Sequence, residues 1–415
     1  MSLRWDVNRL RREFPALARA SNSRQAVYFD GPAGSQVPQR VADAVSRYLL
    51  QTNANHGGHF TTSRESDALL EQARQAVADL LGISDADSVA FGANMTTLTF
   101  ALSRALARTW RAGDEIIVTK LDHDANVTPW MLAARDAGAT VRHIGIRAAD
   151  CTLDLDDFES KVSPRTRLVA VGCASNAVGT INPISSIIER AHAVGAQVFL
   201  DAVHYAPHAL MDATSWDCDF LACSAYKFFG PHVGVLYGKR KLLEELPAYK
   251  VRPAPDDLPG RWMTGTPNHE GIIGTAAAID YLCDIGRGMG ATGDRRQLLK
   301  TAFDGIRDYE RELGAHLIAG LKRLPQIRIW GITDGERCHE RVPTIAITHS
   351  RLPAGKLAGQ LDRHGIFTWH GNFYALALSV ALGLEPEGML RIGLLHYNTV
   401  EEVERLLAVL ADFDT

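Results

Sequence analysis

Short apolar runs alternate with amphipathic stretches between about residues 65 and 240 of the chain. The apolar runs have the length of buried parallel strands, and the stretches between them have the spacing of helices with one apolar face. This alternation predicts an α/β domain with a mostly parallel sheet and helices on both of its faces. The expected strands are 88–92, 114–120, 139–146, 167–175, 196–203, 220–226 and 233–238, and the expected helices are 66–82, 95–110, 127–138 and 184–195.

The pattern changes after residue 240. Residues 249–268 are rich in Pro and Gly and predict a loop. Two helices follow, at 270–286 and from about 295 to 324, and then a smaller α+β unit in which Thr399 and Glu402 form a capping box. We therefore expect three parts, which are an N-terminal segment (1–25) that packs on the small domain, a large domain (26–285) and a small C-terminal domain (286–415).

Composition narrows the class of protein. The chain has 415 residues, and its net charge of −4 argues against a general nucleic-acid or anionic-membrane surface. No apolar run reaches the roughly 18 residues of a membrane span, and the charged N-terminus lacks the apolar core of a signal peptide. The six cysteines form no CxxC pair, and their spacing suggests no zinc site. We expect them to be reduced thiols. We expect a soluble, cytoplasmic protein.

Polar residues gather where the predicted strands end. In "SAYKFFGPHVG", Lys227 follows an apolar strand and stands between Ser224, Tyr226 and a glycine-containing turn. In "FGANMTTLTF", Thr96 and Thr97 lie between a strand and a helix, where backbone N–H groups and hydroxyls suit a phosphate. The same residue types also serve as ordinary helix caps, and that alternative stays open.

Other strand ends carry a carboxylate, two imidazoles and an amide. These are Asp201 and His204 in "FLDAVHYAPH", His123 in "LDHDANV", and Asn176 in "SNAVGTINPI". Each one alone can be structural: a cap, a satisfied core imidazole or a plain turn. Together with Lys227 they suit a cofactor that has an aldehyde, a ring nitrogen and a phosphate, and pyridoxal phosphate has all three.

Ordered motifs along nearly the whole chain resemble the class V aminotransferase family of fold-type I pyridoxal-phosphate enzymes, especially its cysteine desulfurase branch. They run from "YFDGPAGSQVP" through "SNAVGTINPI" and "TGTPNHEGIIGTAAAIDYL" to "LRIGLLHYNTVEEVERL". The resemblance implies a fold-type I architecture, with a mostly parallel seven-stranded sheet and a smaller α+β C-terminal domain. It also implies a homodimer with shared active sites and a small amino-acid substrate.

The same resemblance implies roles for individual residues. Lys227 would form the Schiff base, Asp201 would pair with the pyridine nitrogen, and His123 would stack on the ring. The residues implied around them are Asn176 and His204 near the phenolic oxygen, Thr96, Thr97 and Ser224 at the phosphate, Thr266 at the partner subunit's phosphate, and Arg391 at the substrate carboxylate.

The chain departs from the desulfurase pattern at three places. Desulfurases carry a nucleophilic cysteine in a pattern like R-T-G-H-H-C, but the matching stretch "IFTWHGNFYALAL" has Trp369 at the arginine and Tyr374 at the cysteine. His204 stands where desulfurases usually have Gln. Tyr226 replaces the usual His before the lysine, and the patterns D-x-x-H and S-x-Y-K resemble kynureninase. Tyr226 would bind the cofactor by donating to its phosphate, with protonation of a departing group as the alternative role. Trp369, His370 and Tyr374 would line the substrate side, while ordinary packing of Trp369 remains an alternative.

We therefore expect a Cβ carbon–sulfur lyase that works without a persulfide cysteine. Transamination and epimerisation are the alternatives, because all three reactions begin with loss of the Cα proton. A cofactor-bound partner or regulator of little activity is a fourth hypothesis, which the intact Lys227, Asp201 and Arg391 argue against.

Overall fold

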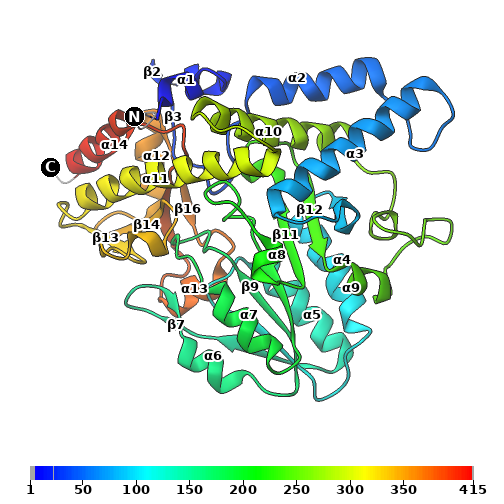
Figure 1. The fold of residues 1–415 in the computed structure, drawn as a ribbon. Coiled ribbons are helices and arrows are strands. Elements are labelled where there is room, and N and C mark those ends of the chain that lie inside the picture. The colour runs from blue at the N-terminus through cyan, green and yellow to red at the C-terminus, as the bar shows by residue number, and fades with distance from the viewer. Residues whose placement is uncertain (1–4, 22, 414–415) are drawn as a thin grey trace.

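The computed structural model describes residues 5–21 and 23–413 and has a large central sheet with a smaller sheet beside it (Figure 1). The central sheet has seven strands in the order β4–β12–β11–β10–β9–β5–β6. Only β12 runs antiparallel to its neighbours, which confirms the expected mostly parallel sheet. Its strands are β4 (Val89–Gly92), β5 (Glu115–Thr119), β6 (Thr140–Ile144), β9 (Thr166–Gly172), β10 (Gln197–Asp201), β11 (Phe220–Ser224) and β12 (Gly234–Gly238).

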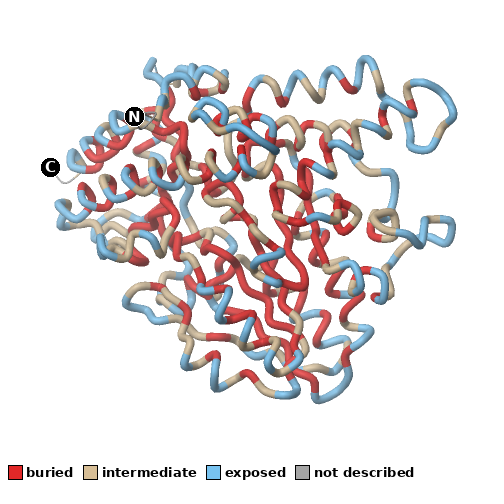
Figure 2. Tube along the Cα trace, in the orientation of Figure 1, coloured by how far each residue is buried: buried red, intermediate tan, exposed pale blue. Residues whose placement is uncertain are grey.

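Successive residues of the inner strands pack into two different cores. In β10, Val198 belongs to the core on one face and Phe199 to the core on the other. Both faces are covered by helices, and the inner strands are buried at nearly every position (Figure 2). This double burial is why the strands read as continuous apolar runs. The covering helices are α3 (Thr61–Leu81), α7 (Ile184–His192), α10 (His269–Gly288) and α11 (Arg295–Leu321) on one face, and α4 (Met95–Ala107), α5 (Thr128–Ala137) and α9 (Arg240–Glu245) on the other.

Helix ends follow local chemistry. α3 and α5 both stop at a glycine in the left-handed region, Gly82 and Gly138, each with φ of 71°. α14 (Val400–Asp412) begins with the predicted capping box between Thr399 and Glu402. Residues 249–268 form irregular chain apart from one short 3₁₀ turn, as the sequence predicts.

The second sheet is antiparallel and has the order β13–β14–β17–β16. α11, α12 (Ala354–Arg363) and α14 bury its apolar face. Strand β16 was not expected from the sequence, because it is a three-residue edge strand with little burial. The strands are β13 (Ile327–Trp330), β14 (Thr344–His349), β16 (Trp369–Gly371) and β17 (Met389–Gly393).

Shorter elements join the two sheets. The N-terminal segment contacts both parts, since Arg11 pairs with Glu402 in α14 while Phe14 packs against Tyr281 in α10.

No helix within residues 5–21 and 23–413 is long and apolar enough to cross a membrane. The remaining elements are α1 (Val7–Arg11), α2 (Gln39–Arg47), α6 (Leu155–Lys161), α8 (Ala213–Trp216), α13 (Leu376–Ala381), β1 (Ala20–Ser21), β2 (Arg24–Gln25), β3 (Val27–Tyr28), β7 (Ile146–Arg147), β8 (Thr152–Leu153) and β15 (Ile366–Phe367).

Candidate active site

A cavity of about 1100 Å³ lies at the carboxyl ends of β5, β9, β10 and β11, the edge where open α/β sheets bind ligands. Every predicted site residue except Thr266 lines it. Thr266 is exposed in the loop before α10 and lies outside this cavity. The predicted residues in its wall are Thr96, Thr97, His123, Asn176, Asp201, His204, Ser224, Tyr226, Lys227, Trp369, His370, Tyr374 and Arg391.

Lys227 sits in a short 3₁₀ turn directly after β11. Its Nζ donates to the carbonyls of Pro32 and Ala33, the latter at 3.1 Å. Burial and then the charge of Arg391 lower its pKa from 10.5 to about 7. A large share of Lys227 is therefore a neutral amine near pH 7, which is the form that attacks an aldehyde.

Two buried carboxylates face the same cavity. Asp201 ends β10, and burial raises its pKa to about 6. Asp122 follows β5, and burial followed by the charge of Asp201 raises its pKa to about 8. Its Oδ1 accepts from the Gly172 N–H at 2.9 Å, and a Cβ on Gly172 would lie 2.6 Å from that oxygen. Two buried carboxyl groups in one cavity wall favour a ligand with a positive charge, because such a charge stabilises their ionised forms.

Asp122 is a cavity residue that the sequence reasoning missed. It lies next to His123 in the same segment after a strand, which is the signal that could have found it. The Asn126 amide donates to it at 3.1 Å, so this carboxylate is anchored to its own loop as well as to β9.

The start of α4 forms the opposite side of the cavity. Asn94 caps the helix by accepting from the Thr97 N–H at 2.8 Å and from its hydroxyl at 2.9 Å, so Thr97 takes part in the helix cap and Thr96 does not. The Thr96 N–H has no acceptor in the part of the chain that the structure describes, and it points from a helix N-terminus. Ser224 accepts from the Met95 N–H at 2.9 Å and keeps its own hydroxyl proton for a ligand. This end of the cavity suits an anion.

His123 lies under the loop that follows β16. Its Nδ1 accepts from the Ala125 N–H at 3.0 Å, so a neutral ring carries its proton on Nε2. Burial and then the charge of Lys227 lower its pKa to about 4. Tyr374 stacks on this ring with centroids 5.4 Å apart, and its own side chain is 72% exposed.

Arg391 on β17 closes the cavity from the small sheet. Its side chain is buried, donates to the Asn176 carbonyl at 2.8 Å and lies 4.3 Å above the Phe373 ring. Phe373 and Tyr374 both have positive φ, 57° and 59°, which non-glycine residues seldom adopt. Asn176 donates to the Phe373 carbonyl at 2.9 Å and so holds this loop against the segment that follows β9. The cationic head of Arg391 suits a carboxylate.

Tyr226 and His204 flank the cofactor-sized space on two further sides. The Tyr226 ring stacks on His232 with centroids 4.8 Å apart. His204 Nε2 lies 2.9 Å from the hydroxyl of Thr344 in β14, so this ring connects the two sheets. The whole arrangement offers an anion site, a neutral amine, two carboxylates and a carboxylate-binding guanidinium in one cavity.

The chain is similar to known proteins over most of its length. A family model described as aminotransferase class-V matches residues 27–406. A cysteine desulfurase of Dickeya dadantii is 31% identical, covering 97% of this chain and 96% of that relative, and one of Pectobacterium atrosepticum is 32% identical with 97% of each covered.

Solved structures of cysteine desulfurases are similar to this chain in fold. The apo cysteine desulfurase of Thermococcus onnurineus superposes with a TM-score of 0.86 at 26% identity, covering 98% of this chain and 97% of the other. A cysteine desulfurase of Escherichia coli gives a TM-score of 0.84 at 27% identity, covering 99% and 98%.

Proposed function

The chain belongs to the class V aminotransferase family, and from that premise we propose that it breaks a carbon–sulfur bond at Cβ of an amino acid without using a persulfide cysteine. Family membership makes it a pyridoxal-phosphate-dependent enzyme that acts on amino acids. The bond that breaks and the missing sulfur nucleophile are the parts we propose.

The chemistry of the cavity wall fits pyridoxal phosphate. The free Thr96 N–H and the Ser224 hydroxyl suit the phosphate, because both are donors at a helix N-terminus. Asp201 suits a protonated ring nitrogen, since burial leaves this carboxylate in need of a cation. Lys227 suits the aldehyde, because its lowered pKa makes the amine available.

When bound, the cofactor supplies an electron-withdrawing ring that stabilises negative charge at Cα of the amino acid. Arg391 would hold the substrate carboxylate and thereby fix the orientation of the Cα–H bond. Lys227, as a neutral amine, would take that proton and hold it on Nζ. Asp201 would keep its negative charge beside the ring nitrogen, which is the position where a carboxylate strengthens the pull on electrons.

The single observation that carries the proposal is the absence of a thiol at the cavity: among the described residues that line it, none is a cysteine. Tyr374 stands on the loop where the resemblance expects the nucleophile. Five of the six cysteines are buried and do not line the cavity, and burial raises the thiol pKa, as for Cys151 to about 11 and Cys283 to about 12. Cys338 lines a separate cavity. Buried, protonated thiols are poor nucleophiles.

The expected reaction converts an S-substituted cysteine and water into a thiol, pyruvate and ammonium. The Cβ–S bond breaks, sulfur leaves with the bonding pair and is protonated, and the remaining enamine is hydrolysed, so atoms and electrons balance without an oxidant. Holoenzyme incubated with S-methyl-L-cysteine should release methanethiol, pyruvate and ammonium in equal amounts. Lys227→Ala should abolish release, whereas the exposed control Lys241→Ala should not.

Other outcomes would point elsewhere. Alanine with a protein-bound persulfide from L-cysteine would overturn the proposal in favour of a desulfurase. One equivalent of keto acid per cofactor, with turnover only after a second keto acid is added, would identify an aminotransferase. Deuterium uptake at Cα with racemisation and no net conversion would identify an epimerase. No reaction with a broad amino-acid panel would favour a regulator.

We also propose a homodimer. An apolar groove runs along α2 and the turn after it, where Leu49 and Leu50 are 45% and 81% exposed. A second copy of the chain would cover this surface and would let the exposed Thr266 serve the partner's cavity. Light scattering of Leu50→Glu should report a monomer where the wild type is a dimer. A cytoplasmic location is proposed as well, because all six cysteines are free thiols.

A further inference from the structure

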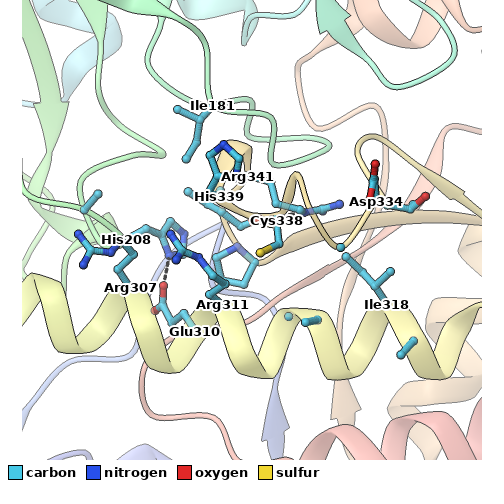
Figure 3. A pocket seen from close by; sticks show the side chains of 18 of the residues that line it. Ile181, His208, Arg307, Glu310, Arg311, Ile318, Asp334, Cys338, His339 and Arg341 are labelled. Carbon is cyan, nitrogen blue, oxygen red and sulfur yellow. Dashed lines mark hydrogen bonds and ion pairs between the residues drawn. The ribbon is translucent and has the colours of Figure 1, made fainter.

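His204 belongs to a buried wall between the active-site cavity and a second cavity. His204 lines the first, and His208 lines the second, which has a volume of about 370 Å³ and lies beside α11 (Figure 3). The two imidazole rings meet edge to face with centroids 5.3 Å apart. Both residues are nearly inaccessible, at 4% and 3% exposure. Polar atoms in such a place need partners.

His208 is fixed by a carboxylate. Its Nδ1 lies 2.7 Å from Oε2 of Glu310, a fully buried residue of α11, and the two side chains point toward one another in Figure 3. A carboxylate oxygen can only accept from this nitrogen unless it is itself protonated, so the pair holds a proton between them. His204 therefore packs against a ring whose position is set by α11.

The hydroxyl of Thr344 determines how the His204 ring is protonated. Thr344 is fully buried, and its hydroxyl contacts His204 Nε2 at 2.9 Å. Within residues 5–21 and 23–413 this hydroxyl has no other hydrogen-bond partner. If Nε2 carried a proton, the buried hydroxyl hydrogen would have no acceptor and an avoidable desolvation cost would remain. Both groups are satisfied when the Thr344 hydroxyl donates to Nε2 of His204. The proton of the neutral ring then lies on Nδ1.

A doubly protonated ring is disfavoured by its surroundings. The positive charges of Arg391 on β17 and of Lys227 after β11 act on His204. The ring of His208, four residues later in the same segment, packs against the His204 ring. Of the carboxylates on the elements packed around it, Glu310 is engaged with His208, while Asp201 and Asp122 line the same cavity as His204. Burial, then the charges of His208, Arg391 and Lys227, push the pKa of His204 well below its usual value.

We propose that Thr344 is a positioning residue that holds His204 with its proton on Nδ1, so that His204 donates a hydrogen bond to an anionic oxygen of the ligand in the active-site cavity. Nδ1 has no partner among the described residues, and His204 is part of that cavity's wall. The inference rests on the proposed function in one respect, because the oxygen it assigns is the ring oxygen of bound pyridoxal phosphate.

The first experiment needs no cofactor. Solid-state ¹⁵N spectra of histidine-labelled apoprotein, with the His204 signals assigned from their loss in His204→Gln, should show a protonated, pyrrole-type Nδ1 and a pyridine-type Nε2 that accepts a hydrogen bond. Thr344→Val removes the donor and should move the Nε2 signal, whereas Thr344→Ser keeps the hydroxyl and should leave it in place. A pyridine-type Nδ1 in the wild type would overturn the proposal.

The second experiment uses the holoenzyme and reads the visible absorption of the bound cofactor against pH. A donor to an anionic oxygen favours the anion, so Thr344→Val should raise the titration midpoint by up to about one unit, and Thr344→Ser should match the wild type. In a His204→Gln background, the glutamine side-chain N–H can donate to the ligand oxygen without help from residue 344. Adding Thr344→Val to that variant should therefore cause no further shift of the titration midpoint.

The outcomes separate the two proposals. An unchanged midpoint in folded, loaded Thr344→Val, or a further shift in the His204→Gln background, would overturn the role of Thr344 and leave the lyase proposal standing. A wild type that binds no pyridoxal phosphate would overturn both. If Thr344→Val does not fold, the wild-type apoprotein spectrum and Thr344→Ser still decide the tautomer.

Discussion

The lowered pKa of Lys227 leads to a prediction about how fast the apoenzyme captures pyridoxal phosphate at different pH values. Burial removes the ammonium from water, and the Arg391 guanidinium repels it, while Asp201 and Asp30 offset part of this effect. The pKa falls from 10.5 to about 7. The neutral amine is the reactive form, so the capture rate should follow its titration.

The size of the effect follows from the two pKa values. At pH 7 an amine with a pKa of 10.5 is neutral in about 1 molecule in 3000, whereas Lys227 with a pKa of about 7 is neutral in about half. Lys227 should therefore react roughly 10³-fold faster at pH 7 than an exposed lysine of equal nucleophilicity. Its rate should rise between pH 5 and 7 and be nearly flat above pH 8.

Stopped-flow absorbance of apoenzyme mixed with pyridoxal phosphate tests this directly from pH 5.5 to 9.5. Lys227→Ala should show no visible band, and Lys241→Ala should behave as the wild type. Arg391→Met removes the nearby cation at similar length, so the midpoint should move upward. A rate that keeps rising about tenfold per pH unit to pH 9.5 would refute the lowered pKa, because that is the behaviour of an ordinary lysine.

Three further predictions follow from the cavity. Asp201→Asn should reduce turnover by about 10²-fold or more while the cofactor's visible band persists, and equal turnover would exclude its proposed role. Tyr374→Cys alone should not form a persulfide from L-cysteine, because the loop lacks the other residues of the desulfurase pattern; a persulfide detected by mass spectrometry would contradict this. Gly172→Ala places a Cβ 2.6 Å from an Asp122 oxygen, so unfolding stability should fall by about 1–3 kcal/mol, against a matched Gly335→Ala in open space that should change little.

The architecture could be predicted from the sequence because its signals are local and strong. Strands buried on both faces must be mostly apolar, as in 168–173, and most successive strands are far enough apart in the sequence for one helix to lie between them. The capping box at Thr399 is a four-residue pattern that needs no tertiary information. The site residues lie at strand ends, and a parallel sheet brings those ends to one edge.

The features that escaped prediction depend on contacts between distant segments. β16 is exposed and short, so it has no apolar pattern, and only its pairing with β17 makes it a strand. The pKa of Asp122 is raised by burial and then by the charge of Asp201, which is 79 positions away and comes close only in the folded protein. In "VPTIAITH", Thr344 has the pattern of an ordinary strand threonine. Its hydroxyl matters only because His204, which follows a strand of the other sheet, lies within hydrogen-bond distance of it in the folded protein.

The departures from the desulfurase pattern lie on both sides of the cavity. Tyr374 and Trp369 come from the loop and edge strand of the small sheet, whereas His204 and Tyr226 follow strands β10 and β11 of the large sheet, close to Asp201 and Lys227 in sequence. Lys227, Asp201 and Arg391 are thus kept, while residues that would contact the ring's edge and the far end of the substrate have changed. This combination suits the proposed lyase, because it keeps the residues for loss of the Cα proton and changes those near the atoms beyond Cβ. A tyrosine stacked on His123 cannot accept sulfur, so under the proposed reaction a sulfur leaving group would depart as a free thiol.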